Sequence, residues 1–297
     1  MTWVDPVSAT NNEFMSDADI SIWQVDAFTS KPFGGNPAAI CILPEYPSDE
    51  WMQKLAGEMN LSETAFLVPT AYRSAFRLRW FTPNVEVDLC GHATLASAHV
   101  LWEQELVEKD AEINFQTRSG ELVCSRSDRG ITLDFPASDY SPFDDGKASS
   151  ALKSALGINE ATVYQTRFDL MVVVESRGAV MELQPNFHAL KDVPVRGVIV
   201  TAQDDRDGID FVSRFFAPQS GIDEDPVTGS AHCCLAPYWS KRLGINPLVG
   251  QQASRRGGMV RCEVDKDRVY LTGDAVTVLE GRLKISVAAL SGEEARS

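Results

Sequence analysis

The sequence has few of the side chains that usually hold metal ions, and none of the spacings that group them. Its 297 residues include only four histidines and six cysteines. They form no C-x-x-C, H-x-x-H or H-E-x-x-H pattern, which argues against a zinc site and against a disulfide scaffold. The sequence also lacks G-x-G-x-x-G and G-x-x-x-x-G-K-[ST] segments, which argues against a nucleotide-binding α/β fold. We therefore expect neither a metal nor a cofactor.

Positive charge and long apolar runs are scarce as well. The chain carries 27 Lys and Arg against 42 Asp and Glu, a formal net charge of −15, which disfavours nucleic acid and anionic lipid as partners. No apolar run reaches the roughly 18 residues needed to cross a bilayer, and the acidic, polar N-terminus does not resemble a secretory signal. We therefore expect a cytoplasmic protein, and the hydrophobic content of 44% predicts a substantial core.

One phrase occurs twice in the sequence. Arg79–Pro83 leads to Gly91-His92-Ala93, and Arg214–Pro218 leads to Gly229-Ser230-Ala231. In each copy an aromatic strand precedes a loop with several carboxylates, and a glycine then opens a helix. Two copies predict two similar halves. If the halves pack face to face, the two helix N-termini meet at one cleft, where free N–H groups and the helix dipoles would favour a bound carboxylate.

Hydrophobic patterning predicts an α+β fold with many short strands and one enclosed helix in each half. The helix expected over residues 92–106 is apolar on nearly every face, and a second is expected over residues 229–243 with Pro237 inside it. Residues 1–19 look like a flexible arm, and residues 136–146 like a linker. We predict a first half-domain at 20–137, which the C-terminal strand is a candidate to complete, a second at 138–297, and an active site between them.

Three side chains near these elements are candidates for chemistry. Glu63 begins an apolar strand, where partial desolvation would suit a general acid or base, although an exposed glutamate capping a turn is the plainer alternative. Asp225 precedes the second helix and could equally be its structural partner. His92 lies in the first turn of the first helix, whose dipole disfavours the charged imidazole. We therefore predict a pKa for His92 below the usual value near 6.5; a packed, hydrogen-bonded histidine is the alternative.

Cys90 immediately precedes the first helix, at a position where thiolates are stabilised. A two-base epimerase with paired cysteines would need a second thiol in the matching stretch, residues 225–229, which contains none. Cys233 and Cys234 lie too far into the second helix to replace it. The sequence therefore disfavours a two-thiol mechanism.

Taken together, several ordered motifs resemble the phenazine biosynthesis PhzF-like family of the diaminopimelate epimerase superfamily. The resemblance covers residues 22–288. It rests on Val25-Asp26-Ala27-Phe28, Gly35-Asn36-Pro37-Ala38, Leu61-Ser62-Glu63-Thr64-Ala65-Phe66, Arg79-Trp80-Phe81-Thr82-Pro83 with Glu86, Cys90-Gly91-His92-Ala93-Thr94, Asp225-Pro226-Val227-Thr228-Gly229-Ser230-Ala231-His232, and residues 252–258.

The resemblance implies two pseudo-symmetric halves, each a curved, mostly antiparallel sheet wrapped around a central helix. It implies a cofactor-free isomerase of a small carboxylate-bearing metabolite, and it allows a homodimer. Matched residue by residue, it implies catalytic roles for Glu63, His92 and Asp225. It implies substrate binding by Asn36, by backbone amides near Gly91 and Gly229, and by Ser230, which corresponds to the family's helix-capping serine.

The resemblance leaves two other functions open. One is a non-catalytic protein that binds a metabolite or a partner in the cleft. The other is an epimerase or racemase that uses Cys90, because a cysteine at this position resembles the first catalytic cysteine of the epimerases, where the phenazine enzyme has a small residue. In that case Glu63 and Cys90 would act as opposed bases.

Overall fold

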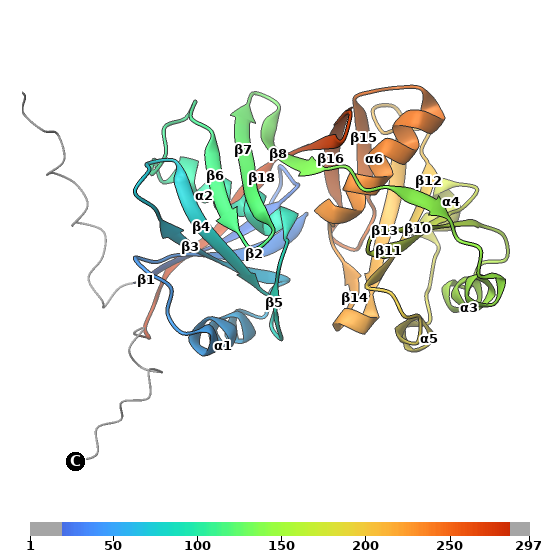
Figure 1. The fold of residues 1–297 in the computed structure, drawn as a ribbon, viewed down its shortest axis with the longest axis horizontal. Coiled ribbons are helices and arrows are strands. Elements are labelled where there is room, and N and C mark those ends of the chain that lie inside the picture. The colour runs from blue at the N-terminus through green and yellow to red at the C-terminus, as the bar shows by residue number, and fades with distance from the viewer. Residues whose placement is uncertain (1–19, 286–297) are drawn as a thin grey trace, which may run out of the picture.

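The computed structural model describes residues 20–285 and consists of two similar halves side by side (Figure 1). The expected N-terminal arm lies outside the described residues, as does the end of the strand expected over 282–287.

The first half contains the strands β1 (Ile20–Ala27), β2 (Asn36–Ile42), β3 (Glu63–Pro69), β4 (Ala75–Phe81), β5 (Glu86–Val87), β6 (Ile113–Thr117), β7 (Gly120–Ser127) and β8 (Gly130–Pro136). The second contains β9 (Tyr140–Pro142), β10 (Thr162–Thr166), β11 (Asp169–Val173), β12 (Gly197–Gln203), β13 (Phe211–Ala217), β14 (Ile222–Asp225), β15 (Leu248–Gln252), β16 (Gly258–Asp265) and β17 (Arg268–Gly273). The last strand, β18 (Ala275–Leu283), pairs with β1.

The two sheets repeat the same pairing pattern. β2–β3 and β4–β6 are parallel in the first half, and β11–β12 and β13–β15 are parallel at the matching places in the second. The remaining pairs are antiparallel, including β8–β17, which joins the halves. The connections also cross reciprocally: β9 follows β8 but pairs with β10, while β18 follows β17 but pairs with β1. Part of the expected linker thus forms the strand β9.

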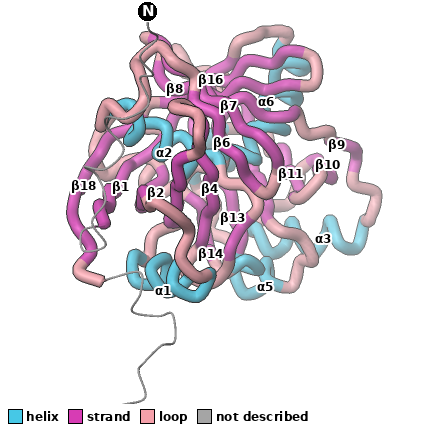
Figure 2. The backbone as a smooth tube through the Cα atoms, turned by 60° about the vertical axis from the view of Figure 1, so that its left-hand side comes forward, coloured by secondary structure: helices cyan, strands magenta, loops and turns pink. Residues whose placement is uncertain are grey.

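Each half encloses one helix. Every residue of α2 (Gly91–Glu103) except His99 and Glu103 is buried, and β1, β2, β3 and β8 surround it (Figure 2). The helix ends three residues earlier than expected, because Glu105 adopts a left-handed conformation. In the second half α6 (Gly229–Leu243) contains Pro237 and packs on β15, β16 and β17. A helix that is apolar on all sides is stable only when protein surrounds it, which explains this position.

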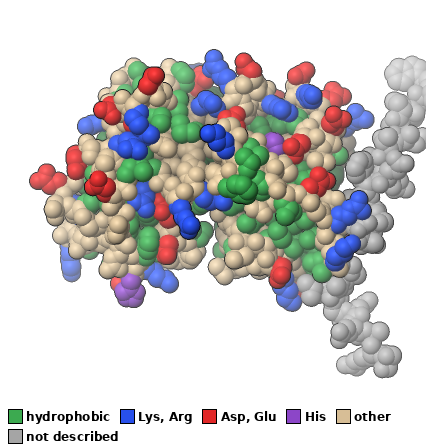
Figure 3. Space-filling view, turned by 180° about the vertical axis from the view of Figure 1, so that it is seen from behind, with side chains coloured by type: hydrophobic (Ala, Val, Ile, Leu, Met, Phe, Trp, Pro, Cys, Tyr) green, Lys and Arg blue, Asp and Glu red, His purple; other side chains and the backbone are tan. Residues whose placement is uncertain are grey.

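The other helices lie outside the central ones. They are α1 (Asp49–Met59), α3 (Gly146–Leu156), α4 (Arg177–Met181), α5 (Phe187–Lys191) and the 3₁₀ turn η1 (Pro218–Ser220). α1 begins where Ser48 accepts a hydrogen bond from the Trp51 amide, and it ends at left-handed Asn60. Its buried face, which includes Trp51 and Leu55, packs against Phe66 and Phe81 in a separate core cluster. No helix within residues 20–285 is long and apolar enough to span a membrane. Seen from behind, acidic and basic side chains are interspersed over the surface (Figure 3).

Candidate active site

The N-termini of α2 and α6 meet in the structure. A Cβ atom added to Gly91 would lie 3.3 Å from the Gly229 Cα, and one added to Gly229 would lie 3.3 Å from the Gly91 Cα. Neither N-cap residue, Cys90 or Thr228, makes a side-chain capping bond to its helix. First-turn N–H groups without a side-chain cap are suited to bind an anion, and here two such turns face one another.

Glu63 and His92 form a close pair beside this contact. Glu63 is the first residue of β3 and His92 the second residue of α2, and Glu63 Oε2 lies 2.9 Å from His92 Nε2. Their side chains are 13% and 5% exposed. Glu63 Oε2 is buried and has no well-aligned hydrogen bond within the described chain. A carboxylate oxygen in this state keeps lone pairs that can accept a proton from a ligand.

The prediction of a lowered pKa for His92 is wrong. Burial lowers the pKa, but the charge of Glu63 and the hydrogen-bond contacts of the ring with Cys90 and Glu63 outweigh it and raise the pKa well above 6.5. The helix-dipole argument considered only the local chain. It omitted Glu63, which is brought to the imidazole by a different strand, and a carboxylate in contact favours the charged imidazole more than one helix end disfavours it.

Asn36 joins this pair to Asp225 across the two halves. The Asn36 Nδ2 atom donates hydrogen bonds to Asp225 Oδ1 (2.8 Å) and to the Val227 carbonyl (2.9 Å), and it lies 3.1 Å from His92 Nδ1. Burial and the charge of Glu63 raise the pKa of Asp225 to about 6, against the opposing effects of His92, Thr228 and Asn36. Asp225 therefore exchanges its proton near neutral pH, as a general acid or base must.

Two further residues of this network were not assigned a role from the sequence. Gln252 accepts a hydrogen bond from the Thr228 amide (2.8 Å) and donates to the Asp225 carbonyl (2.8 Å). Thr228 in turn donates to Asp225 Oδ2 at 2.5 Å. Both residues lie in the matched motifs, but only the three-dimensional contacts show that they hold Asp225 in place.

Ser230 does not cap its helix, contrary to the role that the resemblance implied. The N-cap of α6 is Thr228, and Ser230 is the second helical residue. The Ser230 Oγ atom accepts a hydrogen bond from Arg196 Nη2 at 3.0 Å, and that guanidinium also binds Asp169 through two nitrogens. Because its oxygen is occupied in this way, the hydroxyl proton of Ser230 is available to another acceptor.

The Cys90 side chain lies close to those of Glu63 and His92. Its Sγ is 3.5 Å from His92 Nδ1 and 4.0 Å from Nε2, and one donor atom each from Glu63, Cys90 and His92 lie within 4.8 Å of one another. Two opposed bases must flank a carbon with each about 3–3.5 Å away, hence about 6–7 Å from one another. Burial and the Glu63 charge also raise the pKa of Cys90 to about 11, so the thiol is protonated near neutral pH. This geometry disfavours Glu63 and Cys90 as opposed bases.

The same three side chains are the group within residues 20–285 that could converge on a metal ion. In this structure His92 Nε2 contacts the Glu63 carboxylate at 2.9 Å, and His92 Nδ1 lies 3.1 Å from the Asn36 amide nitrogen. The arrangement thus fits an acid–base cluster better than a metal centre.

Comparisons with known proteins identify the family to which the chain belongs. The family model described as "Phenazine biosynthesis-like protein" (PhzC-PhzF) matches residues 25–281. An uncharacterized isomerase of Halalkalibacterium halodurans is 50% identical over 262 residues, which cover 88% of this chain and 97% of that relative. An uncharacterized isomerase of Pseudomonas aeruginosa is also 50% identical, over 89% of this chain and 98% of that relative.

The solved structures extend the same likeness. The crystal structure of a PhzF family protein from Enterococcus faecalis has a TM-score of 0.81 at 41% identity and covers 89% of this chain and 99% of that chain. The expected fold of two pseudo-symmetric halves around central helices is thus confirmed, and the curated relatives place this chain among the isomerases. The chain belongs to the phenazine biosynthesis-like (PhzC-PhzF) family.

Proposed function

We propose that this isomerase acts without a cofactor on a small carboxylate-bearing metabolite, and that Glu63 is its acid–base group. The observation that carries the proposal is the buried Glu63 Oε2, which lies beside His92 and has no well-aligned hydrogen bond within the described chain. It lies in the same site as the two facing helix N-termini, at which a carboxylate would be held.

In the proposed reaction a substrate carboxylate accepts hydrogen bonds from the first-turn amides of α2 and α6. Glu63 removes a proton from a carbon activated by that carboxyl group or by a conjugated system. The C–H electron pair moves into the conjugated system, and Glu63 returns the proton to another atom on the same face. One C–H bond breaks and another bond to hydrogen forms, so the substrate gains and loses no atoms.

The surrounding groups support this role for a single base. His92 lies 2.9 Å from Glu63 Oε2 and fixes the position of the carboxylate before proton removal. Asp225, whose pKa is raised to about 6, is the remaining titratable partner of His92 and can balance its charge. The Cys90 thiol lies too close to Glu63 to act as an opposed base, which supports a reaction with Glu63 as the single base.

Solvent-exchange measurements test the proposal. The protein is incubated in D2O with a panel of small unsaturated and amino carboxylates, and deuterium incorporation is followed by NMR for wild type, Glu63→Gln and Cys90→Ala. Incorporation that disappears only in Glu63→Gln supports the proposal. Loss only in Cys90→Ala would favour a cysteine-dependent epimerase or racemase, and binding of a carboxylate without any incorporation would favour a non-catalytic binding protein.

A further inference from the structure

The position of Asn36 depends on a turn that is held from the other half of the molecule. Asn36 begins β2 directly after Gly34 and Gly35. Gly35 has a φ of +58°, and a Cβ atom there would lie 2.0 Å from the Ala27 carbonyl oxygen. The turn is therefore tight and admits little variation before the amide that contacts both His92 and Asp225.

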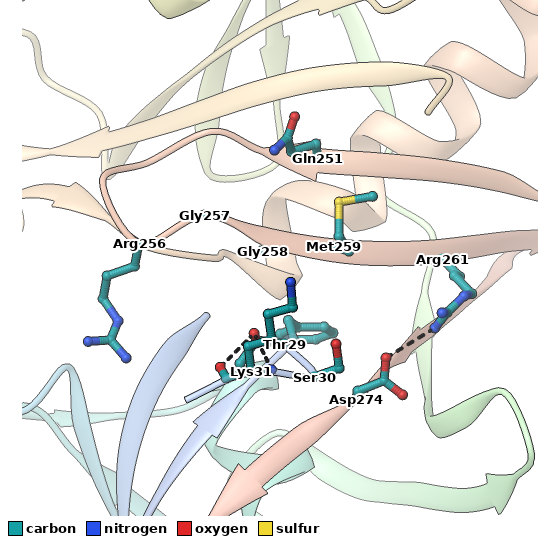
Figure 4. A pocket seen from close by; sticks show the side chains of 11 residues that line it. Thr29, Ser30, Lys31, Gln251, Arg256, Gly257, Gly258, Met259, Arg261 and Asp274 are labelled. Carbon is teal, nitrogen blue, oxygen red and sulfur yellow. Dashed lines mark hydrogen bonds and ion pairs between the residues drawn. The ribbon is translucent and has the colours of Figure 1, made fainter. Parts of the chain in front are cut away.

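Arg256 reaches this turn from the connection between β15 and β16. Its Nη2 atom donates to Asp26 Oδ1 (2.7 Å) and to the Gly34 carbonyl (2.8 Å), and its Nε donates to the Gly35 carbonyl (2.9 Å). Figure 4 shows the Arg256 side chain extending from the second half toward the strands of the first, away from Lys31 and Met259. One planar guanidinium thus holds three acceptors of the other half in a fixed relation.

The acceptors are themselves well fixed. Asp26 is 1% exposed, and its second oxygen accepts a hydrogen bond from the Phe33 amide at 2.7 Å. The Gly35 amide donates to the Gly257 carbonyl at 2.7 Å, so the residue after Arg256 holds the same turn. Because Asp26 has no other basic partner among the ion pairs of the described chain, loss of Arg256 would leave a buried carboxylate unpaired.

We propose that Arg256 is a positioning residue of the acid–base site: it fixes the turn at residues 34–35 so that the Asn36 amide spans His92 and Asp225. The catalytic consequence of this inference rests on the proposed function, but the position of Asn36 can be measured without any reaction. It also gives a role to the motif at residues 252–258, where Gln252 binds the Asp225 carbonyl while Arg256 binds the turn that precedes Asn36.

Release of Asn36 would change the charge balance of the site. The Asn36 hydrogen bond lowers the pKa of Asp225, while burial and Glu63 raise it and His92 and Thr228 lower it. Without that bond the pKa of Asp225 rises further above its ordinary value. The acidic limb of a pH profile that requires ionised Asp225 then moves to higher pH, an effect that a purely structural ion pair would not produce.

The chain provides a matched control. Arg206 binds Asp204, whose side chain is fully buried, at 2.6 Å, so Arg206→Ala also removes an arginine from a buried carboxylate, while Arg177 remains 3.6 Å from it. Asp204 lies on the segment after β12, and its polar partners do not include Asn36, His92 or Asp225. Any general effect of breaking such a pair should appear in both variants.

Hydrogen exchange of the Asn36 side-chain amide tests the inference without a substrate. The NH2 signal is assigned in a ¹⁵N-labelled spectrum by its loss in Asn36→Ser, and its solvent exchange is measured in wild type, Arg256→Ala, Arg256→Lys and Arg206→Ala. We expect about tenfold faster exchange or more in Arg256→Ala, the factor for loss of a hydrogen bond involving a charged group. Arg256→Lys should show a smaller increase, and Arg206→Ala none.

Equal Asn36 exchange in wild type and Arg256→Lys, together with equal exchange in any folded Arg256→Ala, would overturn the inference. If Arg256→Ala does not fold, the comparison of Arg256→Lys with Arg206→Ala decides. Where a substrate of the exchange assay is in hand, the acidic limb of its pH profile should move upward in Arg256→Lys and stay in place in Arg206→Ala. If the Asn36 amide loses protection in the Arg256 variants but neither wild type nor any variant incorporates deuterium into a substrate, the proposed function is refuted and the positioning role remains.

Discussion

The two halves have the same strand plan but different side chains at the places where they meet. Strand register makes Gly197, the first residue of β12, the counterpart of Glu63 in β3, and it makes Val87 the counterpart of Asp225. Ser230 likewise occupies the position in α6 that His92 occupies in α2. A Cβ atom at Gly197 would lie 2.3 Å from the Phe215 ring, so the second half has no room for a carboxylate there.

One pair of contacts is repeated in both halves. Arg79 binds Glu86 through two nitrogens in the first half, and Arg214 binds Glu224 in the same way in the second. The repeated contacts hold the loops before α2 and α6, whereas the acid–base residues occur once. We infer that what is symmetric in this fold is scaffold and what is asymmetric is chemistry.

The largest expected effect comes from comparing a carboxylate that occurs in one half only with a carboxylate of the repeated ion pair. Glu63→Gln should reduce deuterium incorporation by about 10²–10⁴-fold, the usual contribution of a positioned acid–base group. Glu224→Gln, which removes a carboxylate from the repeated pair, should leave incorporation per folded molecule within a few-fold of wild type. Similar losses in both variants would mean that Glu63 is only one more scaffold carboxylate.

Next in size is the effect of the repeated ion pairs on stability. Arg214→Met leaves the partly buried Glu224 without its arginine and also frees the Leu183 carbonyl, which Arg214 Nη1 binds at 2.8 Å. We expect a loss of about 3 kcal/mol in the free energy of unfolding in urea, as for other broken buried pairs. Arg79→Met should cost less, because Arg118 still lies 2.7 Å from Glu86. A larger loss in Arg79→Met would contradict this account.

The sequence predicted the features of this site that depend on neighbouring residues, and it missed those that depend on contacts between distant elements. The repeat predicted that Gly91 and Gly229 open facing helices, because it depends on strand and helix patterns along the chain, and the structure brings them into contact. The pKa of His92 was predicted wrongly because Glu63 reaches the ring from a distant strand. The capping role of Ser230 was wrong because Thr228 is the N-cap and Ser230 lies inside the helix. The network of Asn36, Gln252 and Arg256 depends on which loops of the two halves meet, and no sequence spacing encodes that.

The third prediction concerns the pH dependence of stability, which should differ between variants at Asp225 and at its counterpart, Val87. Unfolded Asp225 ionises near its ordinary pKa of 3.8, but in the folded protein burial raises the pKa to about 6. A raised carboxyl pKa makes folding less favourable as pH rises through this interval, and the penalty is complete above about 6. At the order-of-magnitude level it amounts to about 3 kcal/mol.

Asp225→Asn should therefore have a flatter stability profile than wild type between pH 4 and about 6.5, measured by urea unfolding at each pH. The variant keeps an oxygen that can accept the Asn36 hydrogen bond. Val87→Ala changes the counterpart position, which holds no titratable group, and should shift stability by the same amount at every pH. If the difference between Asp225→Asn and wild type is independent of pH, Asp225 does not carry the raised pKa.

The smallest effect should come from Cys90, the residue that most resembles an epimerase base. Its thiol is buried beside His92 and, with a pKa of about 11, is neutral near pH 7.5, so it has little thiolate to offer as a base. Its counterpart as N-cap of α6 is Thr228, whose hydroxyl donates to Asp225. Cys90→Ala should thus leave deuterium incorporation within about threefold of wild type, because a residue outside proton transfer contributes only through packing.

The measurement is the same D2O assay, with Cys124→Ala, which removes another fully buried thiol, as the control for packing loss. A loss of two orders of magnitude in Cys90→Ala alone would show that the thiol donates or accepts a proton in the reaction. The first half would then contribute two proton-transfer residues, Glu63 and Cys90.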